Sequence, residues 1–380
     1  MYNRIIIIAL FICFTGCNTK TKTPAGSAGT SNYTINPDWV YYIEKNESYE
    51  KKNLILQDIA TVDYIKLETT PDCFLGEVDF FNDVQLMDSC IFITSEFIVF
   101  RFDRNGKFLS KITRRGRGPN EYRSLKSVGI DHIKKEVLIY DYIGDKLLKY
   151  DYDGKFINSI DLKDVNRIGF LGGDTLACYS ENIRTEPAYS LRSSVDGRIL
   201  KSFSEINQKV TYINQPLYNI DIFRKNRGEF FFNTTLSDTI FSVNKYRRIP
   251  RYILLPPNNP DNFKKEGNTA MPHLICETDY FAALSIFKNN SEPSHIPKYY
   301  IIDKAQNAVY EGWIRNSDTG TSFRPYSSMQ KDNQFVALFD ISQLKEIDDE
   351  GKLSGKIKEL YDISDEIDNP ILMIATAKGK

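Results

Sequence analysis

The chain has 380 residues, and its 49 basic residues nearly balance its 50 acidic ones, so no global positive field directs it to nucleic acid. Aromatic residues make up 13 % of the sequence, a share that suits β-sheets, where flat and branched side chains pack on a pleated surface. The length exceeds that of a usual single domain, but closed all-β folds often reach it as one domain.

The N-terminus has the features of an export signal. Residues 5–14 are an unbroken apolar run, which is too short to span a bilayer as a helix but matches the apolar region of a signal peptide. Thr15-Gly16-Cys17 follows and resembles a bacterial lipobox, in which the cysteine is lipidated. An ordinary signal peptide with a chance cysteine is the alternative. If the lipobox is real, lipid chains on Cys17 attach the protein to a membrane.

The sequence divides into three segments. We expect residues 1–16 to be a lipoprotein signal peptide, residues 17–53 to be the lipidated N-terminus with a flexible tether, and residues 54–380 to be the folded domain. The tether is best seen in residues 18–31, which consist of Asn, Thr, Lys, Pro, Ala, Gly and Ser without apolar periodicity, a composition typical of linkers.

Four cysteines follow the signal segment, at Cys73, Cys90, Cys178 and Cys276. They are far apart, with no C-x-x-C pair and no histidine at ligand spacing, which argues against a zinc site. One or two disulfides are compatible with an oxidising envelope. The sequence favours the other interpretation, in which most are buried single thiols that pack as small apolar groups.

From residue 54 onwards, short runs rich in Val, Ile, Phe and Tyr alternate with turn residues, which is the pattern of a many-stranded all-β fold. Hairpin turns are marked by Asn-Gly or Asp-Gly pairs that end at Gly106, Gly154 and Gly197, because glycine supplies the positive φ of a tight turn. These glycines lie 48 and 43 residues apart, a period typical of four-stranded propeller blades.

The runs predict a six-bladed β-propeller of four-stranded antiparallel blades, with seven blades as the alternative. The last group of strands is one strand short, and the early run at residues 54–68 has no group of its own. We expect this N-terminal strand to complete the last sheet and close the ring, so that no blade edge stays open.

A basic, glycine-rich insert at residues 114–122 links the first blade to the second. Guanidinium groups suit carboxylates and phosphates, and glycines let the backbone approach a ligand, so the insert suggests an anionic ligand such as an acidic sugar. The alternative, which the sequence favours, is a structural crossover in which Glu121 pairs with an arginine and Tyr122 packs between blades. The ligand-binding candidates are Arg114, Arg115, Arg117, Glu121, Tyr122 and Arg123.

No catalytic or metal-binding motif is recognisable: G-x-S-x-G and H-E-x-x-H are absent from the sequence. We therefore predict no catalytic residue, no metal site and no cofactor, while a single cation in the central channel stays open. An enzymatic alternative, a lyase or hydrolase acting on an acidic polysaccharide, would use His132 or Tyr122 near Arg115 and Arg117. His132 is expected at the channel-facing end of the second blade's inner strand.

Three features together resemble the six-bladed β-propeller lipoproteins common in Bacteroidetes, which are related in shape to NHL-repeat propellers: the lipobox at Cys17, the pattern Gly116-x-Gly-Pro-x-Glu-Tyr122, and the closing strand after Asn369-Pro370. Leu67-Glu-Thr-Thr70 also fits. The resemblance implies the fold but little about function, because most members have no established activity.

The resemblance further implies an outer-membrane lipoprotein of the cell envelope. Relatives displayed on the cell surface often carry acidic residues directly after the cysteine, and residues 18–31 carry none, which favours a periplasm-facing anchor. We expect a monomeric, non-catalytic binding or scaffold module. Its partners would be a glycan or an envelope protein and the membrane bound through Cys17, but not nucleic acid.

Overall fold

The computed structural model describes residues 40–44, 48–76, 83–180, 189–203, 224–226, 229–233, 238–255, 270–288, 298–322 and 333–379. The signal segment, Cys17 and most of the expected tether lie outside these ranges, as do the expected strand at residues 323–327 and nearly all of the one at 218–224. Within the described ranges the regular structure is almost entirely β.

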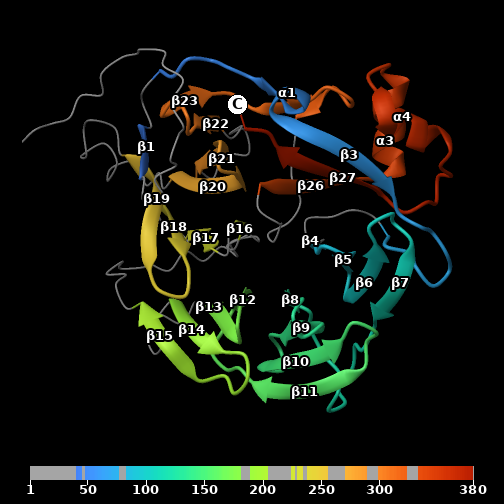
Figure 1. Cartoon of the computed structure of the whole chain (residues 1–380), viewed down its shortest axis with the longest axis vertical. Helices are drawn as coiled ribbons and strands as arrows, with labels where there is room; N and C mark the ends of the chain where they lie inside the picture. The colour runs from blue at the N-terminus through green and yellow to red at the C-terminus, as the bar shows by residue number, and fades with distance from the viewer. Residues whose placement is uncertain are drawn as a thin grey trace, which may run out of the picture. The chain divides into compact units, whose positions relative to one another are not determined.

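The strands of the described residues form seven sheets, and the protein is a seven-bladed β-propeller (Figure 1). Four blades have four antiparallel strands in chain order. The first contains β4 (Asp83–Leu86), β5 (Cys90–Ser95), β6 (Ile98–Asp103) and β7 (Phe108–Ile112), and the second β8 (Ser127–Asp131), β9 (Glu136–Asp141), β10 (Lys146–Asp151) and β11 (Phe156–Asp161). The third contains β12 (Arg167–Gly172), β13 (Thr175–Tyr179), β14 (Tyr189–Ser193) and β15 (Ile199–Phe203), and the fifth β20 (Ala270–Glu277), β21 (Phe281–Lys288), β22 (Lys298–Asp303) and β23 (Ala308–Glu311).

The other three blades recruit N-terminal strands. The fourth contains β16 (Arg224–Asn226), β17 (Glu229–Asn233), β18 (Thr239–Val243) and β19 (Arg248–Leu255), with β1 (Tyr41–Glu44) added at its edge. The sixth contains β2 (Leu54–Ile55), β24 (Ile314–Asn316) and β25 (Thr321–Ser322), and the seventh β26 (Gln334–Phe339), β27 (Ile371–Ala377) and β3 (Ala60–Lys66). Three helices accompany them in the described ranges: α1 (Leu56–Ile59), α3 (Ile341–Asp349) and α4 (Gly355–Asp362).

The six-blade count was wrong, and the alternative of seven is the one that the structure has. The missed blade is the small sheet of β2, β24 and β25, whose strands are only two or three residues long. Strands this short cannot display the alternation of polar and apolar residues by which a strand is recognised in a sequence. β2 and β3 both lie within the run at residues 54–68 that was expected to form one strand, and α1 separates them.

Closure of the ring by an N-terminal strand is confirmed. β3 pairs antiparallel with β27, with Lys66 opposite Ile371 and Ala60 opposite Ala377. Asn369 reinforces this closure: its side-chain amide donates to the backbone oxygens of Glu68 (2.7 Å) and Cys73 (2.8 Å), and its side-chain oxygen accepts from the Leu75 amide at 2.8 Å. Asn369 is fully buried, so the two ends of the domain are joined by a polar group whose bonds are all made inside the protein.

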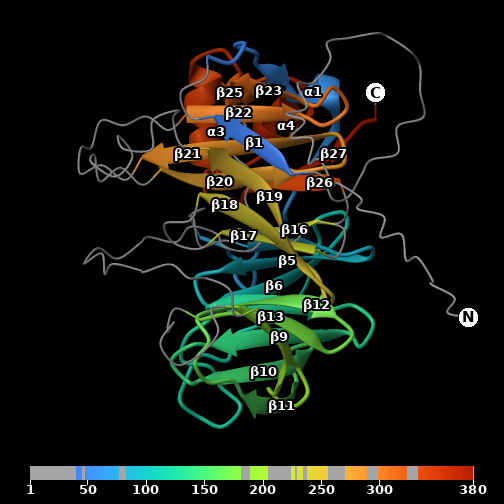
Figure 2. The ribbon, with the colours of Figure 1, turned by 90° about the vertical axis from the view of Figure 1, so that its left-hand side faces the viewer.

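The N-terminal segment also runs along the outer edges of the blades before it enters β3. β1 pairs in parallel with β19 (Figure 2). The Lys52 amide donates to the carbonyl of Glu311, the last residue of β23, at 3.1 Å, and β2 pairs in parallel with β24. These pairings cover backbone groups at three successive blade edges, which would otherwise be open to pairing with another chain.

The three turn glycines make the same contact at three places in the ring. Gly106, Gly154 and Gly197 have φ values of 86°, 83° and 76°. A Cβ on them would lie 2.3 Å from the Lys66 oxygen, 3.1 Å from the Lys111 oxygen and 2.5 Å from the Asp161 oxygen, respectively. Each of these oxygens belongs to the outermost strand of the preceding blade. The hairpins thus set the spacing between blades, and glycine is required both for the turn and for the close approach.

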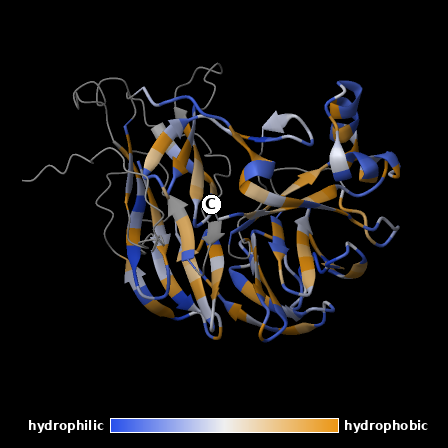
Figure 3. Cartoon of the chain, turned by 45° about the horizontal axis from the view of Figure 1, so that its top comes forward, coloured by the Kyte–Doolittle hydropathy of each residue, from blue (hydrophilic) through white to orange (hydrophobic). Residues whose placement is uncertain are grey.

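The core lies between neighbouring sheets. Between the first and second blades it includes Phe92, Val128, Ile139 and Tyr150, all buried, and Figure 3 shows hydrophobic residues gathered along the strands and hydrophilic ones in many of the connecting loops. No disulfide joins the four cysteines in the described structure, and all four are buried. Among the helices of the described ranges, none combines the length and apolar character needed to cross a membrane.

Candidate functional site

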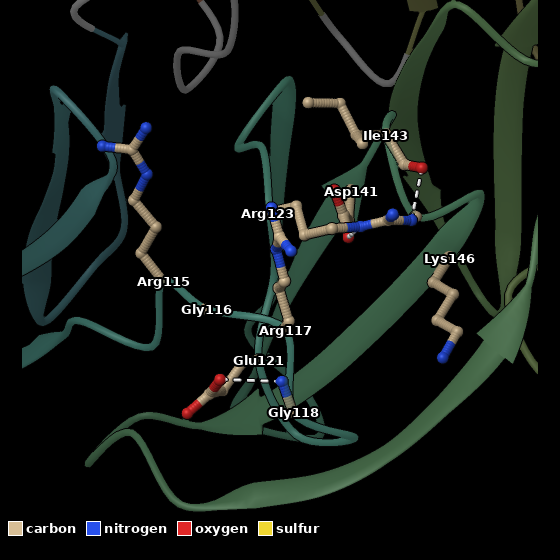
Figure 4. Close-up of a pocket in the computed structure, with 10 residues that line it drawn as sticks. Arg115, Gly116, Arg117, Gly118, Glu121, Arg123, Asp141, Ile143 and Lys146 are labelled. Atoms are coloured by element: carbon tan, nitrogen blue, oxygen red, sulfur yellow. Dashed lines mark hydrogen bonds and ion pairs between the residues drawn. The ribbon is translucent and has the colours of Figure 1, made fainter.

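A surface cavity of about 800 Å³, here called the main cavity, lies where the crossover loop between β7 and β8 (residues 113–126) meets the hairpin between β9 and β10 (Figure 4). The crossover loop contains the basic insert singled out in the sequence. The lining residues are Arg115, Gly116, Arg117, Gly118, Glu121 and Arg123 from the loop and Asp141, Ile143, Gly144 and Lys146 from the hairpin region.

Tyr122 anchors the crossover loop and is not one of the lining residues. Its ring is fully buried and packs edge-on against Tyr150, with centroids 6.4 Å apart. Its hydroxyl donates to the Phe97 carbonyl at 2.5 Å and lies 3.2 Å from the Ile112 carbonyl. Burial raises the pKa of this hydroxyl to about 12, so Tyr122 stays neutral at physiological pH, in the position expected of a structural residue between blades.

Glu121 shapes the loop through the backbone. Its carboxylate accepts a hydrogen bond from the Gly118 amide at 2.8 Å. No arginine of the described ranges pairs with it, so the pairing of Glu121 with an arginine that the structural interpretation expected is wrong. A Cβ on Gly116 would lie only 1.9 Å from this carboxylate. Glycine at position 116 therefore leaves the space into which Glu121 folds back to hold the turn.

Asp141 and Arg123 join the hairpin to the loop. The side chain of Asp141 is 3 % exposed, and one of its oxygens accepts from both the amide and the hydroxyl of Ser124 at 2.9 Å. Its other oxygen lies 3.9 Å from the Arg123 Nε, while the Arg123 Nη2 donates to the Ile143 carbonyl. Arg123 thus already has protein partners and holds the floor of the cavity in place.

Three cationic side chains of the main cavity lack such carboxylate partners. Arg115 and Arg117 are exposed, and the guanidinium of Arg115 lies over the Phe97 ring at 3.9 Å from its centroid. Among the described residues, neither arginine forms an ion pair with a carboxylate, and Lys146 does not either. Because the Glu121 and Asp141 carboxylates are occupied by loop contacts, the cavity offers positive charge to an incoming group.

A second cavity, of about 380 Å³, has Arg114 in its lining. Asn120 belongs to it as well, and its carbonyl accepts a hydrogen bond from the Tyr150 hydroxyl at 2.8 Å. Asp153, the acidic group of this lining, is paired with Arg101 at 3.1 Å. The full lining is Arg114, Asn120, Asp153, Gly154, Lys155 and Phe156, so the crossover loop contributes cations to two separate cavities.

His132 lies away from both cavities. It is exposed in the turn between β8 and β9, at the end of the two strands where Asp131 pairs with Glu136. The main cavity lies beyond the other end of these strands, where Ser127 pairs with Tyr140. Four residues of strand separate the two ends by about 13 Å. The structure therefore does not bring His132 together with Arg115 and Arg117. In the described residues no cluster of His, Cys, Asp or Glu has the geometry of a metal site.

Sequence reasoning missed the hairpin contribution of Asp141, Ile143, Gly144 and Lys146. A signal was available, because strands of an antiparallel blade alternate in direction. The connection before the first strand and the turn between the second and third strands must therefore lie at the same end of the blade. The turn after the predicted strand ending near Tyr142 could have been placed beside the basic insert on this ground alone.

Fold and cavity together define a β-propeller with a basic surface site where two blades meet. The family model described as "Domain of unknown function (DUF4934)" matches residues 40–376, and the chain belongs to this family. The match does not indicate a specific relation to NHL-repeat propellers. No match was found among curated proteins.

Comparison with solved structures supports the fold through the first of two matches. A Bacteroides fragilis protein named as exported is 20 % identical with a TM-score of 0.69, over 90 % of this chain and 100 % of that chain. A member of the DUF4221 family from Bacteroides vulgatus is 9 % identical with a TM-score of 0.45, over 85 % of this chain and 99 % of that chain. At these identities the likeness concerns the fold alone, and the second structure carries no further argument.

Proposed function

We propose that the protein is a non-catalytic binding module of the cell envelope whose main cavity takes a carboxylate-bearing glycan. The observation that carries this proposal is the charge arrangement in the cavity. Arg115, Arg117 and Lys146 have no carboxylate partner among the described residues, while the carboxylates beside them are engaged in holding the loop. Guanidinium and ammonium groups bind carboxylates through charge-assisted hydrogen bonds.

The proposal combines the two interpretations of the insert that the sequence left open. Tyr122, Glu121 and Arg123 act as structural residues, through contacts with the protein itself. This framework presents Arg115 and Arg117 on a loop held in place before any ligand arrives, which reduces the entropy lost on binding. Ile143, 57 % exposed, adds an apolar surface suited to the C–H face of a sugar ring.

The lyase or hydrolase alternative would need an acid or base within hydrogen-bond reach of the bound sugar. Tyr122 has its hydroxyl buried and bonded to backbone, and His132 lies at the far end of the strands. The candidates named for that alternative thus lie apart from the exposed cations, which supports binding over turnover.

Location in the envelope is proposed from the sequence: the apolar run at residues 5–14 and the lipobox at Cys17. The Bacteroides fragilis protein, which is matched over 90 % of this chain and 100 % of its own, is named as exported, which fits that location. We expect the full-length protein to fractionate with the outer membrane when expressed in a Bacteroides host. Cys17→Ala should shift it to the soluble fraction and abolish incorporation of labelled palmitate, and an unchanged membrane fraction would contradict the lipid anchor.

Binding is tested with a glycan array that contains uronate-bearing and matched neutral oligosaccharides, followed by titration calorimetry on the positives. Arg117→Ala and Lys146→Ala should each weaken uronate binding about two- to fivefold, because an exposed ion pair contributes about 0.5–1 kcal/mol. Arg315→Ala, an exposed arginine on β24 outside both cavities, is the matched control and should change nothing.

Three outcomes would contradict the proposal. Absence of binding to every uronate, with salt-sensitive binding to an acidic protein instead, would show that the ligand of the main cavity is a protein and not a glycan. Unchanged uronate affinity in the Arg117→Ala/Lys146→Ala double variant would place the ligand elsewhere. Release of unsaturated products that stops in His132→Ala would establish the lyase alternative.

A further inference from the structure

We propose that the ligand is an extended polyanionic chain, an acidic polysaccharide, that crosses the crossover loop and occupies both cavities. This inference rests on the proposed function and deepens it, since a single acidic sugar would satisfy the main cavity alone. It is carried by two observations: the spread of cations in the main cavity and the continuation of positive charge into the second cavity.

The cations of the main cavity do not converge on one point. Figure 4 shows the side chains of Arg115, Arg117 and Lys146 spread across the cavity, with their charged ends well separated. A site for one carboxylate normally directs several donors at the same pair of oxygens, as in a bidentate arginine clamp. A spread of single cations matches a ligand that carries its negative charges at intervals along a chain.

Positive charge continues on the other side of the loop. Arg114 lines the second cavity directly beside Arg115 in the sequence, and Lys155 joins it from the hairpin between β10 and β11. Both side chains are exposed, and neither has a carboxylate partner among the described residues, since Asp153 pairs with Arg101. The same loop thus supplies cations to both cavities, and its residues Gly118 and Asn120 line the main and the second cavity, respectively.

The ridge between the cavities is built as a fixed element. The Gly118 amide is bonded to Glu121, and the Asn120 carbonyl accepts from the buried Tyr150. A chain laid over this ridge would find both sets of cations already in position. Two linked binding events then reinforce each other through effective concentration without any new contact.

The lining favours a polysaccharide over a single-stranded nucleic acid. Proteins that bind single strands combine a basic groove with aromatic side chains on which bases stack. No aromatic side chain is among the residues that line the main cavity. Phe156 lines the second cavity, but it is half-buried and its ring packs edge-on against Tyr150. The whole chain has a formal net charge of −1. An acidic sugar chain requires only spaced cations and polar or aliphatic contacts.

The test is titration calorimetry of the mature protein with oligogalacturonates of increasing defined length, with neutral malto-oligosaccharides of the same lengths as the ligand control. The dissociation constant should fall by about tenfold or more once the chain spans both cavities, and should then level off. Arg114→Ala/Lys155→Ala should abolish this gain while leaving the affinity for the shortest bound oligomer unchanged. Arg117→Ala/Lys146→Ala should weaken binding at every length.

Arg315→Ala/Lys51→Ala removes the same charge from exposed positions outside both cavities and should keep the full length dependence. Equal affinity for short and long oligomers, with binding still dependent on Arg117, would overturn the polymer inference and leave the proposed function standing. Absence of uronate binding at all lengths would overturn both. Tighter binding of single-stranded DNA than of an oligogalacturonate with the same number of charges would replace the polysaccharide by a nucleic acid.

Discussion

Neighbouring blades meet at seams, and two of these seams can be compared: the closing seam, between the seventh and first blades, and the seam between the first and second blades. They share a glycine contact and differ in where their polar side chains lie. At both, a hairpin glycine packs against the preceding outer strand: Gly106 against Lys66, and Gly154 against Lys111. At the closing seam, the polar side chain of Asn369 is buried and bonded to backbone groups of the protein. At the seam between the first and second blades, Tyr122 is buried, whereas Arg115 and Arg117 line the surface cavity.

This difference distinguishes polar side chains that hold the blades together from charged side chains that have no carboxylate partner in the described structure. At the closing seam every polar atom of the Asn369 side chain has a partner inside the protein. At the seam with the crossover loop, Tyr122 holds the loop in place, while Arg117 and Lys146 have no carboxylate partner among the described residues. Charges without a structural role at an otherwise satisfied joint are the best reason to expect a ligand there.

The largest effect should come from Asn369→Ala. It leaves the buried Leu75 amide and the partly buried Glu68 carbonyl without the partner that Asn369 supplies, and the Cys73 carbonyl with only the Thr70 amide at 3.4 Å. Each lost partner costs about 1–3 kcal/mol, so we expect about 3 kcal/mol of lost stability. The measurement is urea unfolding followed by fluorescence. Asn158→Ala, an exposed asparagine on β11, is the control and should stay within about 0.5 kcal/mol of the wild type. A small effect at Asn369 would show that the closing seam does not depend on this side chain.

A glycine series separates backbone strain from close contact. Gly172 has a φ of 83° with nothing within 4 Å of a built Cβ, so Gly172→Ala should cost only the strain of about 1–2 kcal/mol. Gly106→Ala adds a clash with the Lys66 oxygen at 2.3 Å, and Gly154→Ala a milder one at 3.1 Å. The loss in unfolding midpoint should therefore be smallest for Gly172→Ala, larger for Gly154→Ala and largest for Gly106→Ala. Equal losses at all three would mean that the hairpins do not set the blade spacing.

Tyr122→Phe should cost about 1–2 kcal/mol, because the partly buried Phe97 carbonyl loses the donor that Tyr122 supplies. Binding of an anionic glycan should be retained once the variant is folded, since the ring still packs against Tyr150. The check is a paired measurement of unfolding and of uronate affinity on the same sample. Loss of affinity with unchanged stability would assign Tyr122 to the ligand and end the contrast between the two seams.

The smallest effect concerns pH at the closing seam. Burial acts to raise the pKa of the Asp368 carboxyl, but hydrogen bonds from Lys66 and from the Asp365 amide outweigh it, so the pKa lies below the ordinary value of 3.8. The stability that this carboxylate contributes is present above that value and is lost as pH falls through the lower folded-state pKa. Wild type and Asp368→Asn should thus differ by about 1 kcal/mol or less near neutral pH, and the difference should shrink as the pH falls below the ordinary pKa of 3.8 and through the lower folded-state pKa. A constant difference would contradict this role.

Much of the fold could be predicted from residues that act locally. Gly106, Gly154 and Gly197 revealed the blade period because each combines a φ of 76–86° with a close approach to the neighbouring blade. Other turns have positive φ at non-glycine residues, such as Lys135 and Asp145. The closing strand was predictable because an unpaired edge is unfavourable, and one early strand had no other partner. The patterns around Leu67 and Asn369 are now explained as well, since they meet at the closing seam.

The rest depended on contacts that leave no local signal. The small sixth blade consists of strands of two or three residues drawn from the two ends of the chain, and such strands have no period to read. For the site, the sequence identified the loop but could not tell which arginines it uses internally. That distinction required the positions of Asp141 and Ile143, which come from a separate hairpin.

The closing seam also determines the order in which the protein can fold. The strands of the first, second, third and fifth blades come from continuous stretches of the chain, whereas the seventh joins Glu68 to Asn369, which are 301 residues apart in the sequence. Pairing between residues so far apart is intrinsically slow, because the chain loses the entropy of the long intervening loop before any stabilising contact forms. Until the C-terminal strand arrives, β3 has an exposed edge and Gly106 packs against a strand not yet fixed. The seam that makes the finished ring stable is therefore the stage at which a folding chain is most open to misassembly.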